Sequence, residues 1–206
     1  TNWAIKRGNS LTRPLMETIA GVHKDAYLPS FTNKPFKKRT PASVQGKNLR
    51  KVVLYATCFV NHNNPQIGEA AQAIFSKNGI ETQVVYPSCC GMPQLEQGDI
   101  ARVAENAKKI SSELASWVDR GYDIVALVPS CALMLKFEWP LILPDDKNIT
   151  RLSKATFDIA EYVVDIAKNE GLVEGLNKID GSVSLHLACH AKAQNMGPKA
   201  VEMLRL

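Results

Sequence analysis

Lys51-Val-Val-Leu-Tyr-Ala-Thr57 is a short run of mostly apolar, β-branched and aromatic residues, and Cys58 follows it directly. A run of this length and composition is typical of a strand that is buried on both faces of a parallel sheet. A polar loop comes next, followed by residues 67–78, which have the apolar spacing of a helix and end at Gly79. Glycine is a common residue at a helix C-terminus, so the stretch predicts a strand, a loop and a covering helix.

The same unit recurs along the chain. Further strands are predicted at residues 81–86, 123–128 and 182–187, and further helices at residues 13–20, 99–120, 132–137, 152–169 and 198–206. Strands that alternate with helices in this way indicate an α/β fold. We therefore expect a mostly parallel sheet with helices on both faces.

Positive charge is concentrated in the first 50 residues, a segment without a sustained apolar period. This leader holds ten Lys and Arg against two acidic residues, a net charge of +8, whereas the other 156 residues carry −3 and the whole chain +5. A basic segment of this kind can bind an anionic membrane surface, an acidic partner or nucleic acid, or it can simply be solvated. Because no aromatic platform is interleaved with these charges, nucleic acid is the least favoured partner.

No part of the chain approaches the roughly 18–20 consecutive apolar residues of a membrane span. The first residues also lack the basic and then apolar layout of a secretion signal. We therefore expect a cytoplasmic protein, with peripheral attachment to the inner face of the membrane as an option.

The chain has five cysteines: Cys58, Cys89, Cys90, Cys131 and Cys189. An odd number that includes an adjacent pair is a poor disulfide framework. In a reducing compartment, grouped cysteines more often serve metal or redox chemistry.

All five cysteines lie outside the predicted helices, each just after a predicted strand. The carboxyl ends of parallel strands lie at one edge of a sheet, and neighbouring strands are about 4.8 Å apart, so the thiols are expected to form a single site. The alternative is that each thiol is a small buried apolar group, which explains any one of them but not their shared position.

Thiolates favour zinc or an iron–sulfur cluster. Structural zinc sites are usually built from Cys-x-x-Cys pairs, which this chain lacks, so an iron–sulfur cluster is preferred and zinc remains the alternative. A thiol–disulfide function of Cys89 and Cys90 is less favoured, because a disulfide between adjacent cysteines is strained.

Two residues beside the cysteines are further candidates for the cofactor site. Gly91 could adopt a positive φ or let the backbone approach a cluster closely. His190 could hydrogen-bond a cluster sulfur, although a structural role is favoured over a functional one. Met134, Phe137 and Trp139 are expected in the core, and no residue is assigned a catalytic role.

The motifs around the cysteines resemble those of a known family. Cys58, Pro87-Ser-Cys-Cys-Gly-Met-Pro93 and Pro129-Ser-Cys-Ala-Leu-Met-Leu135 resemble the CCG cysteine-rich domain that occurs in heterodisulfide reductase and in the iron–sulfur component of anaerobic glycerol-3-phosphate dehydrogenase. Residues 186–197 look like the opening of a second such domain. The resemblance implies a basic linker at residues 1–50 that follows a ferredoxin-like module, a first CCG domain at 51–180, and a truncated second one at 181–206.

The resemblance also implies a function and a set of ligands. Cys58, Cys89, Cys90 and Cys131 match ligand positions of the first domain, and Cys189 matches the first ligand position of the second. An iron–sulfur protein of this type would pass electrons from a flavoprotein dehydrogenase towards a quinone or another carrier, with a membrane-linked partner. The family motif often ends in Cys-x-x-Cys, where this chain has Met134, so a four-thiolate 4Fe-4S cluster is favoured over a five-thiolate one.

Overall fold

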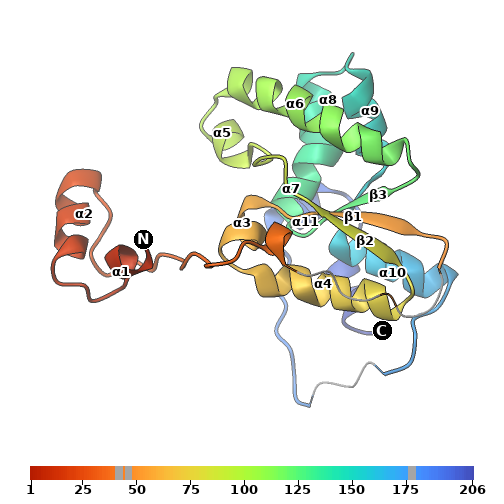
Figure 1. Cartoon of the computed structure of the whole chain (residues 1–206), viewed down its shortest axis with the longest axis horizontal. Helices are drawn as coiled ribbons and strands as arrows, with labels where there is room; N and C mark the ends of the chain where they lie inside the picture. The colour runs from red at the N-terminus through yellow and green to blue at the C-terminus, as the bar shows by residue number, and fades with distance from the viewer. Residues whose placement is uncertain (40–43, 45–47, 176–179) are drawn as a thin grey trace.

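The computed structural model describes residues 1–39, 44, 48–175 and 180–206. Its sheet has the order β2-β1-β3-β4, with every neighbouring pair parallel. The strands are β1 (Lys51–Tyr55), β2 (Glu81–Val85), β3 (Asp123–Ala126) and β4 (Thr156–Asp158). The predicted α/β fold with a parallel sheet is thus confirmed, and the first three strands lie where the sequence places them (Figure 1).

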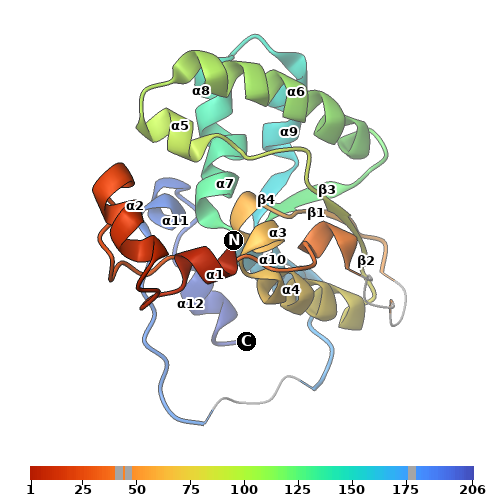
Figure 2. The same cartoon turned by 60° about the vertical axis from the view of Figure 1, so that its left-hand side comes forward.

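Helices cover both faces of the sheet, as predicted. In chain order they are α1 (Asn2–Ile5), α2 (Thr12–Ala20), the 3-10 turn η1 (Phe36–Lys38), α3 (Cys58–His62), α4 (Pro65–Lys77), α5 (Met92–Glu96), α6 (Ile100–Val118), α7 (Pro129–Leu133), the π-helix η2 (Met134–Glu138), α8 (Trp139–Ile142), α9 (Lys147–Lys154), α10 (Ile159–Asn169), α11 (Cys189–Ala193) and α12 (Lys199–Met203). The helices α6 to α9 pack on one face, and α4 and α10 on the other (Figures 1 and 2).

Strand β1 is buried on both faces. Val53 and Tyr55 belong to the apolar cluster under α6 and α8, whereas Val52 and Leu54 belong to the cluster under α4 and α10. Fully burying one such aliphatic side chain contributes about 1.5–3 kcal/mol. This two-sided burial explains why the run is continuously apolar rather than alternating.

The strand predicted at residues 182–187 is wrong. These residues lie outside the sheet and are almost all exposed, and the fourth strand is β4, inside the region predicted as one helix, 152–169. The helical prediction failed because Asp158 is a helix N-cap. Its side chain accepts a hydrogen bond from the amide of Ala160, and the carboxylate of Glu161 accepts one from the amide of Asp158, which is a capping box that starts α10.

The basic leader is ordered over much of its length. Helix α2 confirms the helix predicted at 13–20, and Figure 1 shows α1 and α2 projecting away from the sheet domain at the end of an extended segment. Residues 30–39 run along α3, where the amide of Thr32 donates to the carbonyl of His62 at 2.7 Å. Residues 40–43, 45–47 and 176–179 are outside the described structure, so the domain boundaries at 50 and 180 stay predictions.

Candidate metal centre

Three loops bring four cysteines together at the carboxyl edge of the sheet. Cys58 follows β1, Cys89 and Cys90 follow β2, and Cys131 follows β3. β1 lies between β2 and β3, so the connection after β1 leads to one side of this strand and the connection after β2 leads to its other side. Such a reversal of strand order opens a crevice at the carboxyl ends, which is the usual ligand site of open α/β sheets.

The four thiols lie in two contacting pairs. The Sγ atoms of Cys58 and Cys89 are 3.9 Å apart, and those of Cys90 and Cys131 are 3.1 Å apart. Cys90 and Cys131 are buried, whereas Cys58 and Cys89 are half-buried. The group is therefore closed on its inner side and reaches the surface at the Cys58–Cys89 edge.

Hydrogen bonds between the thiols give them unequal acidity. The pKa of Cys89 lies far below its ordinary value, because hydrogen bonds with the Cys58 and Cys90 side chains and with the backbone of Gly91 stabilise its thiolate. The pKa of Cys58 is raised, because its thiol is hydrogen-bonded to Cys89 and is partly buried. Cys89 is thus the thiol most readily ionised, and thiolates are the form that binds metals.

Two aromatic side chains fix the Cys89-Cys90 loop, a role that the sequence did not predict for either of them. The hydroxyl of Tyr55 donates to the carbonyl of Ser88 at 2.6 Å, and the indole N–H of Trp139 donates to the carbonyl of Cys90 at 3.1 Å. Both side chains are fully buried. A signal was present for each, because Tyr55 ends β1 at the cysteine edge and a buried indole needs a hydrogen-bond acceptor.

Helix starts carry several of the cysteines, which differs from the prediction that all five lie outside helices. Cys58 and Cys189 are the first residues of α3 and α11, and Cys131 lies in the first turn of α7. Thr57, the N-cap of α3, has a positive φ of 21°, and its hydroxyl accepts from the amide of Val60. Amides at helix starts favour the thiolate form of a nearby cysteine.

Gly91 adopts the positive φ that the sequence analysis considered, at 90°. Replacing Gly91 with alanine is expected to destabilise the protein by about 1–2 kcal/mol, because a side chain is strained in this conformation. Chemical unfolding measures the loss. Gly98→Ala is the matched control, since Gly98 has a φ of 79° and open space around it, away from the thiols. Both variants should lose similar stability, but only Gly91→Ala should also lose bound metal. Equal metal content in both would contradict a role of Gly91 in shaping the site.

Cys189 and His190 lie on α11, which packs against α7. The Cys189 thiol is exposed, and among the described residues no hydrogen bond joins it to another cysteine. The Nε2 atom of His190 is 4.0 Å from a carboxylate oxygen of Glu96, at the end of α5. Their helix is fixed to the domain by Gln194, whose side-chain amide donates to the carbonyl of Pro129 at 3.2 Å.

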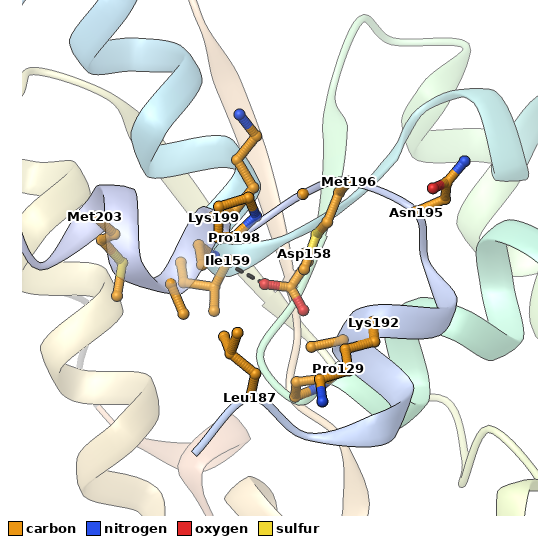
Figure 3. A pocket seen from close by; sticks show the side chains of 14 residues that line it. Pro129, Asp158, Ile159, Leu187, Lys192, Asn195, Met196, Pro198, Lys199 and Met203 are labelled. Carbon is orange, nitrogen blue, oxygen red and sulfur yellow. Dashed lines mark hydrogen bonds between the residues drawn. The ribbon is translucent and has the colours of Figure 1, made fainter. Parts of the chain in front are cut away.

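A cavity of about 480 Å³ lies between the start of α10 and residues 187–203 (Figure 3). Its lining is mostly apolar, and Asp158 is the buried carboxyl group within it. Burial raises the pKa of Asp158. Both of its oxygens already accept hydrogen bonds, from Ala160 and from Gln194, so this carboxyl group serves as a structural cap.

The donor set fits a thiolate-bound group. In the part of the chain that the structure describes, no three His, Cys, Asp or Glu side chains are arranged around a point suitable for a single metal ion. The thiols instead form two adjacent pairs, and four cysteine ligands are the usual number for an iron–sulfur cluster. The all-sulfur set also selects soft metals over hard ones.

Comparison with known proteins identifies the cysteine-bearing part of the chain. Residues 52–136 match the family model of the cysteine-rich domain called CCG. This range contains Cys58, Cys89, Cys90 and Cys131, whereas Cys189 lies beyond it. No solved structure matches the chain significantly.

Several curated proteins are similar over a longer range. One subunit of the anaerobic glycerol-3-phosphate dehydrogenase of Escherichia coli (strain K12) is 23% identical over 197 residues, which are 94% of this chain and 49% of that protein. Lactate utilization protein A of Geobacillus kaustophilus is 29% identical over 147 residues, 68% of this chain and 57% of that protein. The chain therefore spans about half the length of these relatives.

Proposed function

We propose that this chain, whose residues 52–136 belong to the CCG cysteine-rich domain family, is an iron–sulfur electron-transfer component of a redox complex. One observation carries the proposal: the segments that follow three separate strands place four cysteine side chains in two contacting pairs at the strand ends. A purely structural role for isolated cysteines gives no reason for this arrangement. The similarity to a dehydrogenase subunit supports a redox role.

Cys58, Cys89, Cys90 and Cys131 would hold the cluster, which we propose to be of the 4Fe-4S type. The bound cluster would supply one-electron transfer, and the protein would set its position and surroundings. Tyr55 and Trp139 fix the loop that carries two of these ligands. Burial of Cys90 and Cys131 keeps water from the inner side of the site.

The wider context is also a proposal. By the resemblance of its motifs, the chain would receive electrons from a flavoprotein dehydrogenase, with a ferredoxin-like module, and pass them to a quinone-linked partner or another carrier. Cys189 would be a ligand of a second site, with His190 beside it. Both residues lie on α11, which packs on α7 and so places them next to the first site's domain.

Metal analysis of protein purified without oxygen tests the proposal. We expect iron and acid-labile sulfide in similar amounts, a brown colour, and an electron paramagnetic resonance signal after reduction with dithionite. Colourless protein that contains zinc and no sulfide would instead establish a zinc-stapled interaction module and overturn the redox function.

We also propose that the protein attaches peripherally to the inner face of the membrane. None of the described helices is long and apolar enough to span a bilayer. Helix α2 and its N-cap residue nevertheless expose apolar side chains at four-residue spacing: the N-cap Leu11 is 71% exposed, Leu15 57% and Ile19 76%. An exposed apolar helix face beside basic residues suits an anionic lipid surface.

A double substitution tests this attachment. Leu15→Glu with Ile19→Glu is expected to lower co-sedimentation with phosphatidylglycerol vesicles by about tenfold or more, because two apolar contacts become two negative charges. Phe137→Glu with Leu141→Glu is the matched control, since these two apolar side chains, also four residues apart, are 41% and 75% exposed. Unchanged sedimentation of the double variant, or an equal loss in the control, would contradict attachment through α2.

A further inference from the structure

The four-thiol group reaches the surface at one place only within the described residues, the edge formed by Cys58 and Cys89. Two aromatic residues accompany this edge: Phe59, which is 41% exposed, and Tyr86, which is partly buried. The ring of Tyr86 packs edge-on against that of His62, on the helix that Cys58 begins, with the ring centroids 5.4 Å apart. An electron entering or leaving the site would take its shortest route through this edge.

A basic segment borders the same edge. Lys34, Lys37 and Lys38, which we call the basic rim, are all exposed. The ammonium group of Lys37 lies 3.4 Å from the carbonyl oxygen of Tyr86. Lys37 thus links the basic rim, through Tyr86, to the edge where the thiols reach the surface.

The rim is held rigidly against the domain. The amide of Lys37 donates to the side-chain oxygen of Asn61, on α3, at 3.0 Å. The Phe36 ring is fully buried, and it fills the space where a side chain on Gly68 would stand. The rim residues of η1 are therefore held in a fixed position beside α3 (Figure 1).

The charge of the rim is uncompensated. Arg39, the next basic residue, is paired with Glu69 at 2.5 Å. None of the three rim lysines forms an ion pair with any residue that the structure describes. Three unpaired positive charges next to the exposed edge create a local field that attracts a negatively charged surface.

We propose that the basic rim docks an acidic electron-transfer protein, which exchanges electrons with the centre through the Cys58–Cys89 edge. The inference rests on the proposed function and adds the kind of partner. One electron passes in each encounter: the partner's redox centre is oxidised as the cluster is reduced, or the reverse. No bond is made or broken. An acidic protein is favoured over a lipid surface here because Lys37 contacts Tyr86 beside a small electron-accessible edge, and small, short-lived contacts are typical of redox proteins.

Stopped-flow kinetics with a strongly acidic flavodoxin tests the docking. The fully reduced flavodoxin donates one electron to the oxidised cluster of the full chain, and the second-order rate constant is measured at low and at high salt. Lys37→Glu with Lys38→Glu is expected to lower the low-salt rate constant by about tenfold or more, because steering is reversed. At high salt the difference should shrink, because the screening length falls to about 3 Å at 1 M.

Lys108→Glu with Lys109→Glu is the matched control. These two adjacent lysines are exposed on α6 and give the same change in net charge. The control should keep most of the rate constant. Equal losses in both variants would show a net-charge effect alone, and unchanged rates in both would show that flavodoxin docks elsewhere; either result overturns the proposal. Loss of binding to anionic vesicles in the Lys37/Lys38 variant, with an unchanged flavodoxin rate, would assign the rim to lipid and also overturn it.

Two further measurements separate this inference from the proposed function. Reduction of each variant by dithionite, with the iron and sulfide content, shows whether the cluster itself is intact. If the unmodified protein holds no cluster, the proposed function fails, and calorimetric titration with flavodoxin then tests the docking alone. Weaker binding by the Lys37/Lys38 variant than by the Lys108/Lys109 variant would still support the rim, and equal binding would reject it.

Discussion

Replacing Cys90 with serine is expected to abolish the thiolate-bound centre. Cys90 is buried, its sulfur lies 3.1 Å from that of Cys131, and its loop is fixed by Trp139, so no other side chain can take its position. A serine hydroxyl is a hard oxygen donor, which is a poor ligand for a site that suits soft metals. We expect iron and acid-labile sulfide to fall to the background level of metal-free protein.

Cys189→Ser is the matched control for this substitution. The Cys189 thiol is exposed and forms no hydrogen bond with the four thiols in the described structure, so this variant should keep the first centre and its paramagnetic signal. If both variants lost the same amount of iron, the four-thiol site would be the wrong unit, and Cys189 would have to be counted as one of its ligands.

Replacing Trp139 with alanine is expected to lower the free energy of unfolding by about 3–5 kcal/mol. Trp139 is the largest fully buried side chain among the described residues. It packs in the apolar cluster between the sheet and α6. The alanine variant loses this apolar burial, leaves a cavity, and removes the donor for the Cys90 carbonyl. Urea unfolding followed by circular dichroism measures the change.

Trp139→Phe separates the hydrogen bond from the packing. Phenylalanine keeps much of the buried ring but cannot donate to the Cys90 carbonyl, so a smaller loss of about 1–3 kcal/mol is expected. The variant should also bind iron less tightly, because the carbonyl that fixes the loop is left unpaired. Full stability and full iron content in Trp139→Phe would show that this hydrogen bond does not position the loop.

Much of the fold follows from local sequence patterns. The run at 51–57 is continuously apolar, which is why β1 could be predicted as a buried strand followed by a covering helix. The position of Cys58, Cys89 and Cys131 after strands then predicted their shared edge, because parallel strands all end on the same side. Trp139 and Met134 are in the core as expected, whereas Phe137 is 41% exposed.

The remaining features depend on contacts that a single sequence does not display. β4 has only three residues, Thr156–Asp158, and their apolar spacing continues into the next helix, so the capping role of Asp158 was hidden. Residues 182–187 alternate like a strand, but no sheet edge pairs with them in the described structure. Cys189 consequently starts a helix instead of ending a strand.

The contact between Phe36 and Gly68 ties two distant parts of the chain to each other. The ring lies against the bare backbone of α4, so even one added methyl group at position 68 would collide with it. Related chains should therefore show covariation at these two positions, with a bulkier residue at 68 accompanied by a smaller one at 36. Where that exchange has occurred, the lysines beside position 36 should have moved relative to the thiols, which would give such homologues a different preference for redox partners.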